Sequence, residues 1–264
     1  MSAGLLFDAT HCIACNACSA ACKEQNELPL PIEAEPTAYT WTTVQRRAGN
    51  NVRRLCMHCI DPTCVSVCPV GALTRTSQGA VVYDETLCIG CRYCVMACPF
   101  GVPKYQWDSP VPVVGKCILC SDRLERGQST ACASVCPTGA TLFGERDELA
   151  GEAQRRIVEH PGRYADEVYG LEEAGGTGVL MLASAPAAAL GLPTPPREPL
   201  PMLTWRVLSR IPDLVALAAT TLWGIHWITR RRDEVAAAEA RASAAPSEPR
   251  RGIWERVRSL WGAP

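Results

Sequence analysis

The sixteen cysteines of this 264-residue chain constrain its fold more than any other feature of the sequence. All of them lie between residues 12 and 136, and they form four groups of four with short internal spacings. The groups are Cys12, Cys15, Cys18 and Cys22 (group I); Cys56, Cys59, Cys64 and Cys68 (group II); Cys88, Cys91, Cys94 and Cys98 (group III); and Cys117, Cys120, Cys132 and Cys136 (group IV).

The spacing within the groups indicates iron–sulfur clusters. Groups I and III read C-x2-C-x2-C-x3-C, group II reads C-x2-C-x4-C-x3-C, and group IV reads C-x2-C-x11-C-x3-C. Proline follows the last cysteine in groups II, III and IV, whereas Lys23 follows it in group I. The run C-x2-C-x2-C-x3-C-P is the bacterial ferredoxin signature, in which the fourth cysteine ligates the other cluster of a pair. With no cysteine left over, the sequence predicts four [4Fe–4S] clusters.

Two other uses of the cysteines fit less well. Disulfide-dense chains are usually shorter than about 100 residues, and repeated C-x2-C pairs would close strained loops. Zinc sites also use C-x2-C pairs and often add histidine. His11 and His58 lie beside cysteines, but every group already has four thiols. We therefore favour clusters over disulfides or zinc.

The spacing alone leaves open which groups exchange their fourth ligands. The intervals Cys68–Cys88 and Cys98–Cys117 have similar lengths. Pairing group I with II and III with IV would satisfy every ligand, and so would pairing II with III and I with IV.

Three cysteine-containing segments carry a resemblance to a known family. Residues 56–73, 88–105 and 117–140 resemble the four-cluster iron–sulfur subunits of respiratory oxidoreductases. The most similar types are the hydrogenase-2-type iron–sulfur subunit and the beta subunit of membrane-bound formate dehydrogenase. Residues 168–182 favour the hydrogenase type, and the x11 spacing of group IV favours the formate dehydrogenase type. The resemblance extends from about residue 5 to 190.

The resemblance implies the nested pairing of the groups and an α+β fold of two stacked bacterial-ferredoxin-like dicluster modules. The implied ligands are Cys12, Cys15, Cys18 and Cys136 for cluster 1; Cys22, Cys117, Cys120 and Cys132 for cluster 2; Cys56, Cys59, Cys64 and Cys98 for cluster 3; and Cys68, Cys88, Cys91 and Cys94 for cluster 4.

It also implies a subunit that transfers electrons and is not catalytic alone. The expected partners are a large catalytic subunit, of the [NiFe] type or alternatively the molybdopterin type, and an integral membrane quinone-reactive or cytochrome b subunit. A free polyferredoxin is a further alternative, but a soluble shuttle would need no membrane anchor. The net charge of −1 shows no basic excess that would point to nucleic acid.

The chain outside the cysteine groups divides into four expected regions. Residues 1–190 would form the cluster domain, 191–212 a proline-rich linker, 213–230 a single transmembrane helix, and 231–264 a basic tail. Within the cluster domain we expect strands near residues 5–8, 39–45 and 80–84, and a charged amphipathic helix over 145–160.

The anchor rests on residues 214–229, which carry no formally charged side chain. Sixteen helical residues span about 24 Å, somewhat less than the roughly 30 Å core of a bilayer. Trp223 and Trp227 suit an interface, and His226 is an ionisable group inside the run, which is a functional hypothesis by default.

Charge then suggests an orientation. Arg230, Arg231 and Arg232 directly follow the run, so the positive-inside rule places the C-terminus in the cytoplasm and the cluster domain in the periplasm, anchored in the inner membrane. Met1–Leu6 lacks a basic and apolar signal sequence, so we expect the domain to be exported together with a partner that carries the signal.

Overall fold

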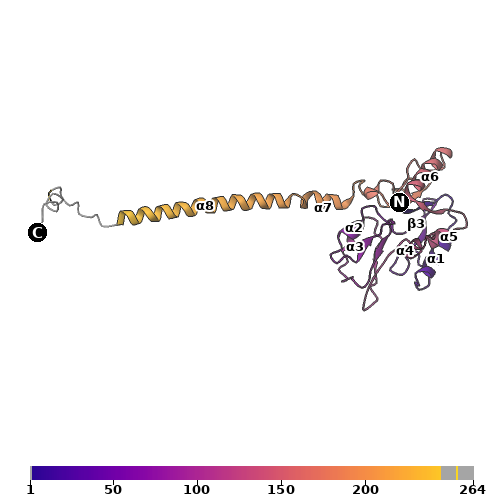
Figure 1. The fold of residues 1–264 in the computed structure, drawn as a ribbon. Helices are drawn as coiled ribbons and strands as arrows, with labels where there is room; N and C mark the ends of the chain where they lie inside the picture. Colours follow the sequence, from indigo (N-terminus) through magenta and orange to yellow (C-terminus); the bar gives the residue numbers. More distant parts are fainter. Residues whose placement is uncertain (1, 245–253, 255–264) are drawn as a thin grey trace. The chain divides into compact units, whose positions relative to one another are not determined.

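The computed structural model describes residues 2–244 and residue 254 (Figure 1). The chain divides into two compact units, Met1–Trp205 and Arg206–Pro264. All sixteen cysteines belong to the first unit.

A three-stranded sheet lies at the centre of the first unit. Its strands are β1 (Ala3–Asp8), β8 (Thr141–Glu145) and β9 (Val179–Leu182), in the order β8-β1-β9. The middle strand β1 runs antiparallel to β8 and parallel to β9, and Leu5 is paired with both Phe143 and Val179. The N-terminal residues are therefore held between segments that come more than 130 residues later in the chain.

The two faces of this sheet have different roles, because successive side chains of a strand point to opposite faces. Leu6 belongs to a cluster with Leu149 and Ala153 of helix α6 (Arg146–Glu159). Leu5 and Phe7 belong to the larger core, which also contains buried cysteines of groups II and IV. The sheet thus separates α6 from the cysteine-bearing loops.

Three antiparallel hairpins complete the strands. They are β2 (Thr43–Arg47) with β3 (Asn50–Arg54), β4 (Leu73–Arg75) with β5 (Val81–Tyr83), and β6 (Lys104–Tyr105) with β7 (Val114–Gly115). The β2–β3 turn consists of Ala48 and Gly49, both at positive φ (43° and 78°). Two-residue hairpin turns favour this geometry, because it matches the twist of the flanking strands.

Short helices follow or contain the cysteine loops. They are α1 (Ala17–Gln25), α2 (Thr63–Ser66), α3 (Tyr93–Ala97), α4 (Ser121–Glu125) and α5 (Ala131–Ser134), and a 3₁₀ turn, η1, covers Glu173–Gly175. Helix α1 of group I lies against α5 of group IV, and α2 of group II lies against α3 of group III. Group I is thus a neighbour of group IV, and group II is a neighbour of group III.

The predicted elements of the first unit are largely present. Helix α6 lies within the expected range 145–160, β1 includes the expected strand at 5–8, and β5 lies within the one expected at 80–84. The strand expected at 39–45 is displaced to Thr43–Arg47. Residues 37–41 instead form a turn in which the Thr37 hydroxyl accepts hydrogen bonds from the backbone N–H groups of Tyr39 and Thr40.

The remaining helices are α7 (Leu200–Leu208) and α8 (Ile211–Ala244). Helix α7 lies within the expected linker 191–212. Its one proline, Pro201, is in the first turn, where the backbone N–H has no partner within the helix and its absence costs nothing. In α8 the helix continues past residue 230 into the expected tail. Residues 245–253 and 255–264 of that tail lie outside the described part of the chain.

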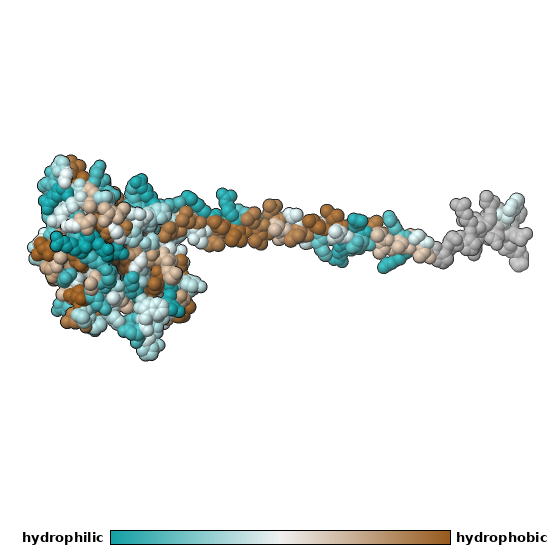
Figure 2. Space-filling model, turned by 180° about the vertical axis from the view of Figure 1, so that it is seen from behind, coloured by the Kyte–Doolittle hydropathy of each residue, from teal (hydrophilic) through white to brown (hydrophobic). Residues whose placement is uncertain are grey.

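One helical segment among the described residues, Leu200–Ala244, is long and apolar enough to cross a membrane. Figure 2 shows apolar side chains along most of its first part, followed by hydrophilic side chains. The hydrophilic part begins at Arg230, which forms a salt bridge with Glu234 one helical turn later (3.2 Å). This apolar segment is consistent with membrane anchoring.

Candidate iron–sulfur centres

All sixteen cysteines are free thiols in the structure, so none is joined in a disulfide. The first loop of every group shares one backbone feature. The second residue after the first cysteine has a positive φ in each case: Ala14 (56°), His58 (48°), Gly90 (70°) and Leu119 (57°). This left-handed residue turns the chain so that its N–H points back toward the preceding sulfur. The Gly90 N–H donates to Cys88 Sγ (3.4 Å), and the Leu119 N–H donates to Cys117 Sγ (3.4 Å).

The thiols come together in four sets that combine different sequence groups. We name the sets sites 1 to 4. Site 1 contains Cys12, Cys15, Cys18 and Cys136; site 2 contains Cys22, Cys117, Cys120 and Cys132; site 3 contains Cys56, Cys59, Cys64 and Cys98; and site 4 contains Cys68, Cys88, Cys91 and Cys94.

Cavities and electrostatic contacts define these sets. One cavity is lined by all four thiols of site 1, and a second by all four thiols of site 2. At site 3 burial raises the pKa of the Cys59 thiol, and its neighbours Cys56, Cys98 and Cys64 raise it further. At site 4 burial raises the pKa of the Cys94 thiol, and its neighbours Cys88, Cys91 and Cys68 raise it further. Each set takes three thiols from one sequence group and one from another.

The four sites form a continuous series. Cys22 of site 2 interacts with Cys18 of site 1, and Cys117 of site 2 interacts with Cys56 of site 3. Cys64 of site 3 in turn interacts with Cys94 of site 4. The neighbours along the series are therefore sites 1, 2, 3 and 4, in that order.

Backbone N–H groups surround the fourth cysteine wherever proline follows it. Burial raises the pKa of the Cys68 thiol, but hydrogen bonds from four backbone N–H groups at residues 70–73 outweigh burial and hold this pKa below its usual value. Burial likewise raises the pKa of Cys136, but hydrogen bonds from the backbone N–H groups of Thr141, Thr138 and Ala140 and from the Thr138 hydroxyl outweigh burial and lower it. The loops after Cys68 and Cys136 thus stabilise the thiolate form that a metal cluster requires. At Cys98 burial outweighs the backbone N–H groups of residues 100–102, and the pKa is raised.

Cys22 is the exception among the fourth cysteines. It lies inside α1 and is followed by Lys23 instead of proline, so it has no such loop. Burial, followed by the charges of nearby thiols, raises its pKa to about 12. The side chain of Lys23 points elsewhere, donating to the carbonyl oxygens of Pro29 (2.6 Å) and Tyr39 (2.8 Å), and so fastens α1 to the following segment.

Two buried cations beside the thiol sets were not found by sequence reasoning. Arg53 lines the cavity of site 2. Lys116 donates to the carbonyl oxygens of Val81 and Cys117 and interacts with the Cys64 thiol of site 3. The only available signal for Lys116 was its position next to Cys117. Arg53 lies three residues before Cys56, which belongs to site 3 and not to site 2.

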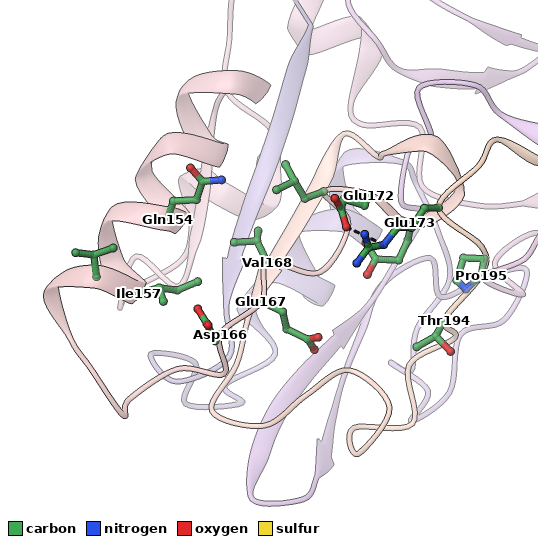
Figure 3. A pocket seen from close by; sticks show the side chains of 12 residues that line it. Gln154, Ile157, Asp166, Glu167, Val168, Glu172, Glu173, Thr194 and Pro195 are labelled. Carbon is green, nitrogen blue, oxygen red and sulfur yellow. Dashed lines mark ion pairs between the residues drawn. The ribbon is translucent and has the colours of Figure 1, made fainter.

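A pocket of about 760 Å³ lies away from these thiols, between α6, the segment Asp166–Glu173 and the chain around Thr194 (Figure 3). Its lining is mixed, and Arg197 forms a salt bridge with Glu172 in it (3.0 Å). No cysteine is among the lining residues, so this pocket is separate from the candidate centres.

The donor set at each site fits a [4Fe–4S] cluster, which is held by four cysteine thiolates. Across residues 2–244 and 254, no group of three or more His, Cys, Asp and Glu side chains is arranged to hold a single metal ion. A cube of iron and sulfide lies between its four thiolates, so it holds them farther apart than one ion would.

Comparisons with known proteins agree with this chemistry. Residues 49–146 match the family described as a 4Fe-4S dicluster domain. The chain is 38 % identical over 261 residues to a protein of Nitratidesulfovibrio vulgaris, covering 90 % of this chain and 70 % of that one. It is 37 % identical over 239 residues to the hydrogenase-2 operon protein HybA of Escherichia coli O157:H7, covering 73 % of each chain.

A similar likeness extends to formate dehydrogenases. The formate dehydrogenase iron-sulfur subunit of Haemophilus influenzae is 32 % identical over 249 residues, covering 85 % of this chain and 79 % of that one. Both types named by the sequence resemblance are therefore found among the relatives. The first unit is a ferredoxin-like [4Fe–4S] domain of mixed helices and strands. The chain belongs to the family of iron–sulfur electron-transfer subunits that includes these hydrogenase-2 and formate dehydrogenase proteins.

Proposed function

We propose that this chain is the electron-transfer subunit of a membrane-bound respiratory oxidoreductase and that it carries four [4Fe–4S] clusters. The clusters would be held by the cysteines of sites 1 to 4 as defined above, in two stacked dicluster modules. The observation that carries this proposal is the continuous series of four thiol sets. A protein that only needed metal for stability would not need its sites to adjoin one another.

Each bound cluster supplies a one-electron redox centre. The chain itself excludes water from the middle of the series, where all four thiols of site 2 are buried. It leaves the ends closer to solvent, with Cys15 of site 1 exposed. Near site 4, Met96 is 85 % exposed and Ile89 66 % exposed. This pattern suits electron entry and exit at sites 1 and 4 and insulation between them.

The partners we propose are a large catalytic subunit and an integral membrane subunit that reacts with quinone or carries a b-type haem. The catalytic subunit would be of the [NiFe] hydrogenase type, which the 37 % identity to HybA supports. A molybdopterin formate dehydrogenase is the second candidate, because the formate dehydrogenase relative covers a larger share of this chain, 85 % against 73 %.

We also propose that α8 anchors the subunit in the inner membrane by a single pass. The expected regions 1–190, 191–212, 213–230 and 231–264 then correspond to cluster domain, linker, anchor and tail. Arg230, Arg231 and Arg232 support a cytoplasmic C-terminus and a periplasmic cluster domain.

Anaerobic purification of the tagged chain from its native membranes tests the proposal directly. Four clusters correspond to about sixteen irons per chain, and the large subunit that co-purifies would identify the catalytic partner by its nickel or molybdenum. Zinc, or a chain with little metal and no large partner, would contradict the proposal. A fully iron-loaded chain found only in the soluble fraction would instead indicate a free polyferredoxin.

Single cysteine variants of the same complex test the ligand sets. Cys12→Ala and Cys136→Ala are far apart in sequence but share site 1, so both should remove the same reduced-cluster signal in electron paramagnetic resonance (EPR) spectra. Cys132→Ala, although it belongs to the same sequence group as Cys136, should remove a different signal. If Cys136→Ala and Cys132→Ala remove the same signal, the nested assignment is wrong.

A further inference from the structure

Arg53 is a fully charged side chain in the interior of the first unit. It lies on β3, and only 2 % of the residue is exposed. Its Nε donates to the Thr42 hydroxyl (2.9 Å) and its Nη1 donates to the Thr141 hydroxyl (3.1 Å). Both partners are neutral, and in the described part of the chain no carboxylate forms a salt bridge with Arg53. Guanidinium cannot lose its proton in a protein, so its charge needs another partner.

Arg53 instead faces cysteines of two neighbouring sites, which carry negative charge when they ligate a cluster. Arg53 interacts with the charges of Cys132 and Cys117 of site 2 and with that of Cys18 of site 1. It lines the same cavity as the four thiols of site 2. The two threonine hydroxyls, one before β2 and one on β8, fix the guanidinium in this place. Arg53 thus lies at the junction between sites 1 and 2.

Cys22 of site 2 has fewer backbone donors than the fourth cysteines that proline follows. This ligand lacks the loop of backbone N–H groups that surrounds Cys68 and Cys136. The Cys22 thiol and Arg53 line the same cavity. A fixed charge in a buried site of low effective dielectric acts more strongly than one in water.

We propose that the positive charge of Arg53 raises the reduction potentials of the clusters at sites 1 and 2. When a cluster takes up one electron, the cluster and its thiolates gain one negative charge. Arg53 stabilises that added charge and keeps its own proton throughout, so no proton is transferred. This inference rests on the proposed ligand sets.

The test is an anaerobic redox titration of the purified complex, followed by EPR spectroscopy, with dithionite as the one-electron reductant. Signals are assigned to sites 1 and 2 by their loss in Cys12→Ala and Cys132→Ala. In Arg53→Met we expect these two signals to shift to lower midpoint potential, while the other two keep their wild-type values. Arg53→Gln, which is uncharged but can still donate hydrogen bonds, should show the same downward shift. If the Arg53→Met complex does not assemble, the titration of Arg53→Gln tests the proposal in its place.

Two further variants separate charge from structure. Arg53→Lys keeps the positive charge and should restore most of the potential. Arg46→Met removes an equal charge from the same hairpin, but Arg46 is exposed to solvent. The cluster potentials of this variant should therefore match those of the wild type. Wild-type potentials in Arg53→Gln would overturn the inference, and so would an equal shift of all four signals. Fewer than about sixteen irons in the wild-type complex would overturn the proposed function itself.

Discussion

The contact between Asp8 and Arg156 connects the end of β1 to α6, and its removal should weaken the whole cluster domain. The Asp8 carboxylate is completely buried four residues before the first cysteine of group I. It accepts hydrogen bonds from Arg156 Nη1 (3.0 Å), Tyr164 Oη (2.8 Å) and the Thr10 N–H (3.0 Å) and hydroxyl (2.7 Å). Arg156→Met keeps the aliphatic stem but leaves the carboxylate without its closest cation.

The expected cost follows from this geometry. Breaking a buried ion pair by removing one partner costs about 3–5 kcal/mol. The Tyr164 and Thr10 donors stay in place, and the Arg156 side chain is 16 % exposed, so we expect a smaller loss, about 2 kcal/mol. If the contact is broken in the transition state for unfolding, this corresponds to unfolding that is roughly 30-fold faster.

The assay is the rate at which the detergent-solubilised complex loses its visible iron–sulfur absorbance in a fixed concentration of urea under anaerobic conditions. A rate is the proper measure because cluster loss makes unfolding irreversible. Arg155→Met is the matched control. Arg155 pairs with Glu152 and Glu159 on the exposed side of the same helix, so its loss should leave the rate nearly unchanged.

A double variant checks the cause. Asp8→Asn removes the buried charge, so adding it to Arg156→Met should slow unfolding relative to Arg156→Met alone. Bleaching of Arg156→Met within about threefold of the wild-type rate would refute the reasoning, because the pair would then contribute little to stability.

The same pair predicts a pH dependence. Burial raises the pKa of Asp8, but the hydrogen bonds from Thr10 and Tyr164, the charge of His11 and the bond from Arg156 outweigh it and hold this pKa below its usual value. A lowered pKa stabilises the fold above the unfolded-state value of about 3.9 and ceases to do so as the pH falls through the folded-state value. The ratio of the Arg156→Met rate to the wild-type rate should therefore be largest near neutral pH and shrink below about pH 4. A ratio that grows in acid would contradict this account.

Three further changes have defined outcomes. In Gly115→Ala the new Cβ would lie 2.1 Å from the carbonyl oxygen of Ala38, so we expect urea bleaching to be markedly faster. Gly151→Ala is the control, because its new Cβ within α6 would meet nothing within 4 Å and should slow bleaching slightly. Equal bleaching rates for the two variants would contradict the predicted clash. Deletion of residues 202–264 should move the chain, expressed without its partners, from the membrane pellet to the supernatant, and continued sedimentation would place the anchor elsewhere. A fluorescent reporter that matures only in the cytoplasm, fused to the C-terminus, should fluoresce, and a silent reporter on a stable fusion would invert the proposed orientation.

The local parts of the candidate site could be predicted from sequence because they depend on short spacings. The loop of group III places Gly90 where a positive φ turns the backbone toward Cys88, and such geometry is encoded within a few residues. The choice of partner group could not be predicted in this way. It depends on α1 lying against α5, a contact between segments more than 100 residues apart.

Arg53 shows why the surroundings of a site are harder to predict than its ligands. In sequence it is one arginine of an Arg-Arg pair in a segment without cysteines. Its burial follows from a tertiary arrangement, since Thr141 comes 88 residues later. The displaced strand β2 has a similar cause, because the polar contacts of Thr37 compete locally with extended pairing.

The position of β1 in its sheet has a consequence for biogenesis. This strand is synthesised before all four cysteine groups, yet its neighbours β8 and β9 end at residues 145 and 182. Until then both edges of an apolar strand are open, and long-range pairing of this kind forms slowly. The hairpin of β4 and β5, with α2 and α3, is complete by residue 97. The inner half of the domain can therefore mature on the ribosome while the outer half still waits for its last strand, and premature termination before residue 182 would leave a half-built subunit exposed to aggregation.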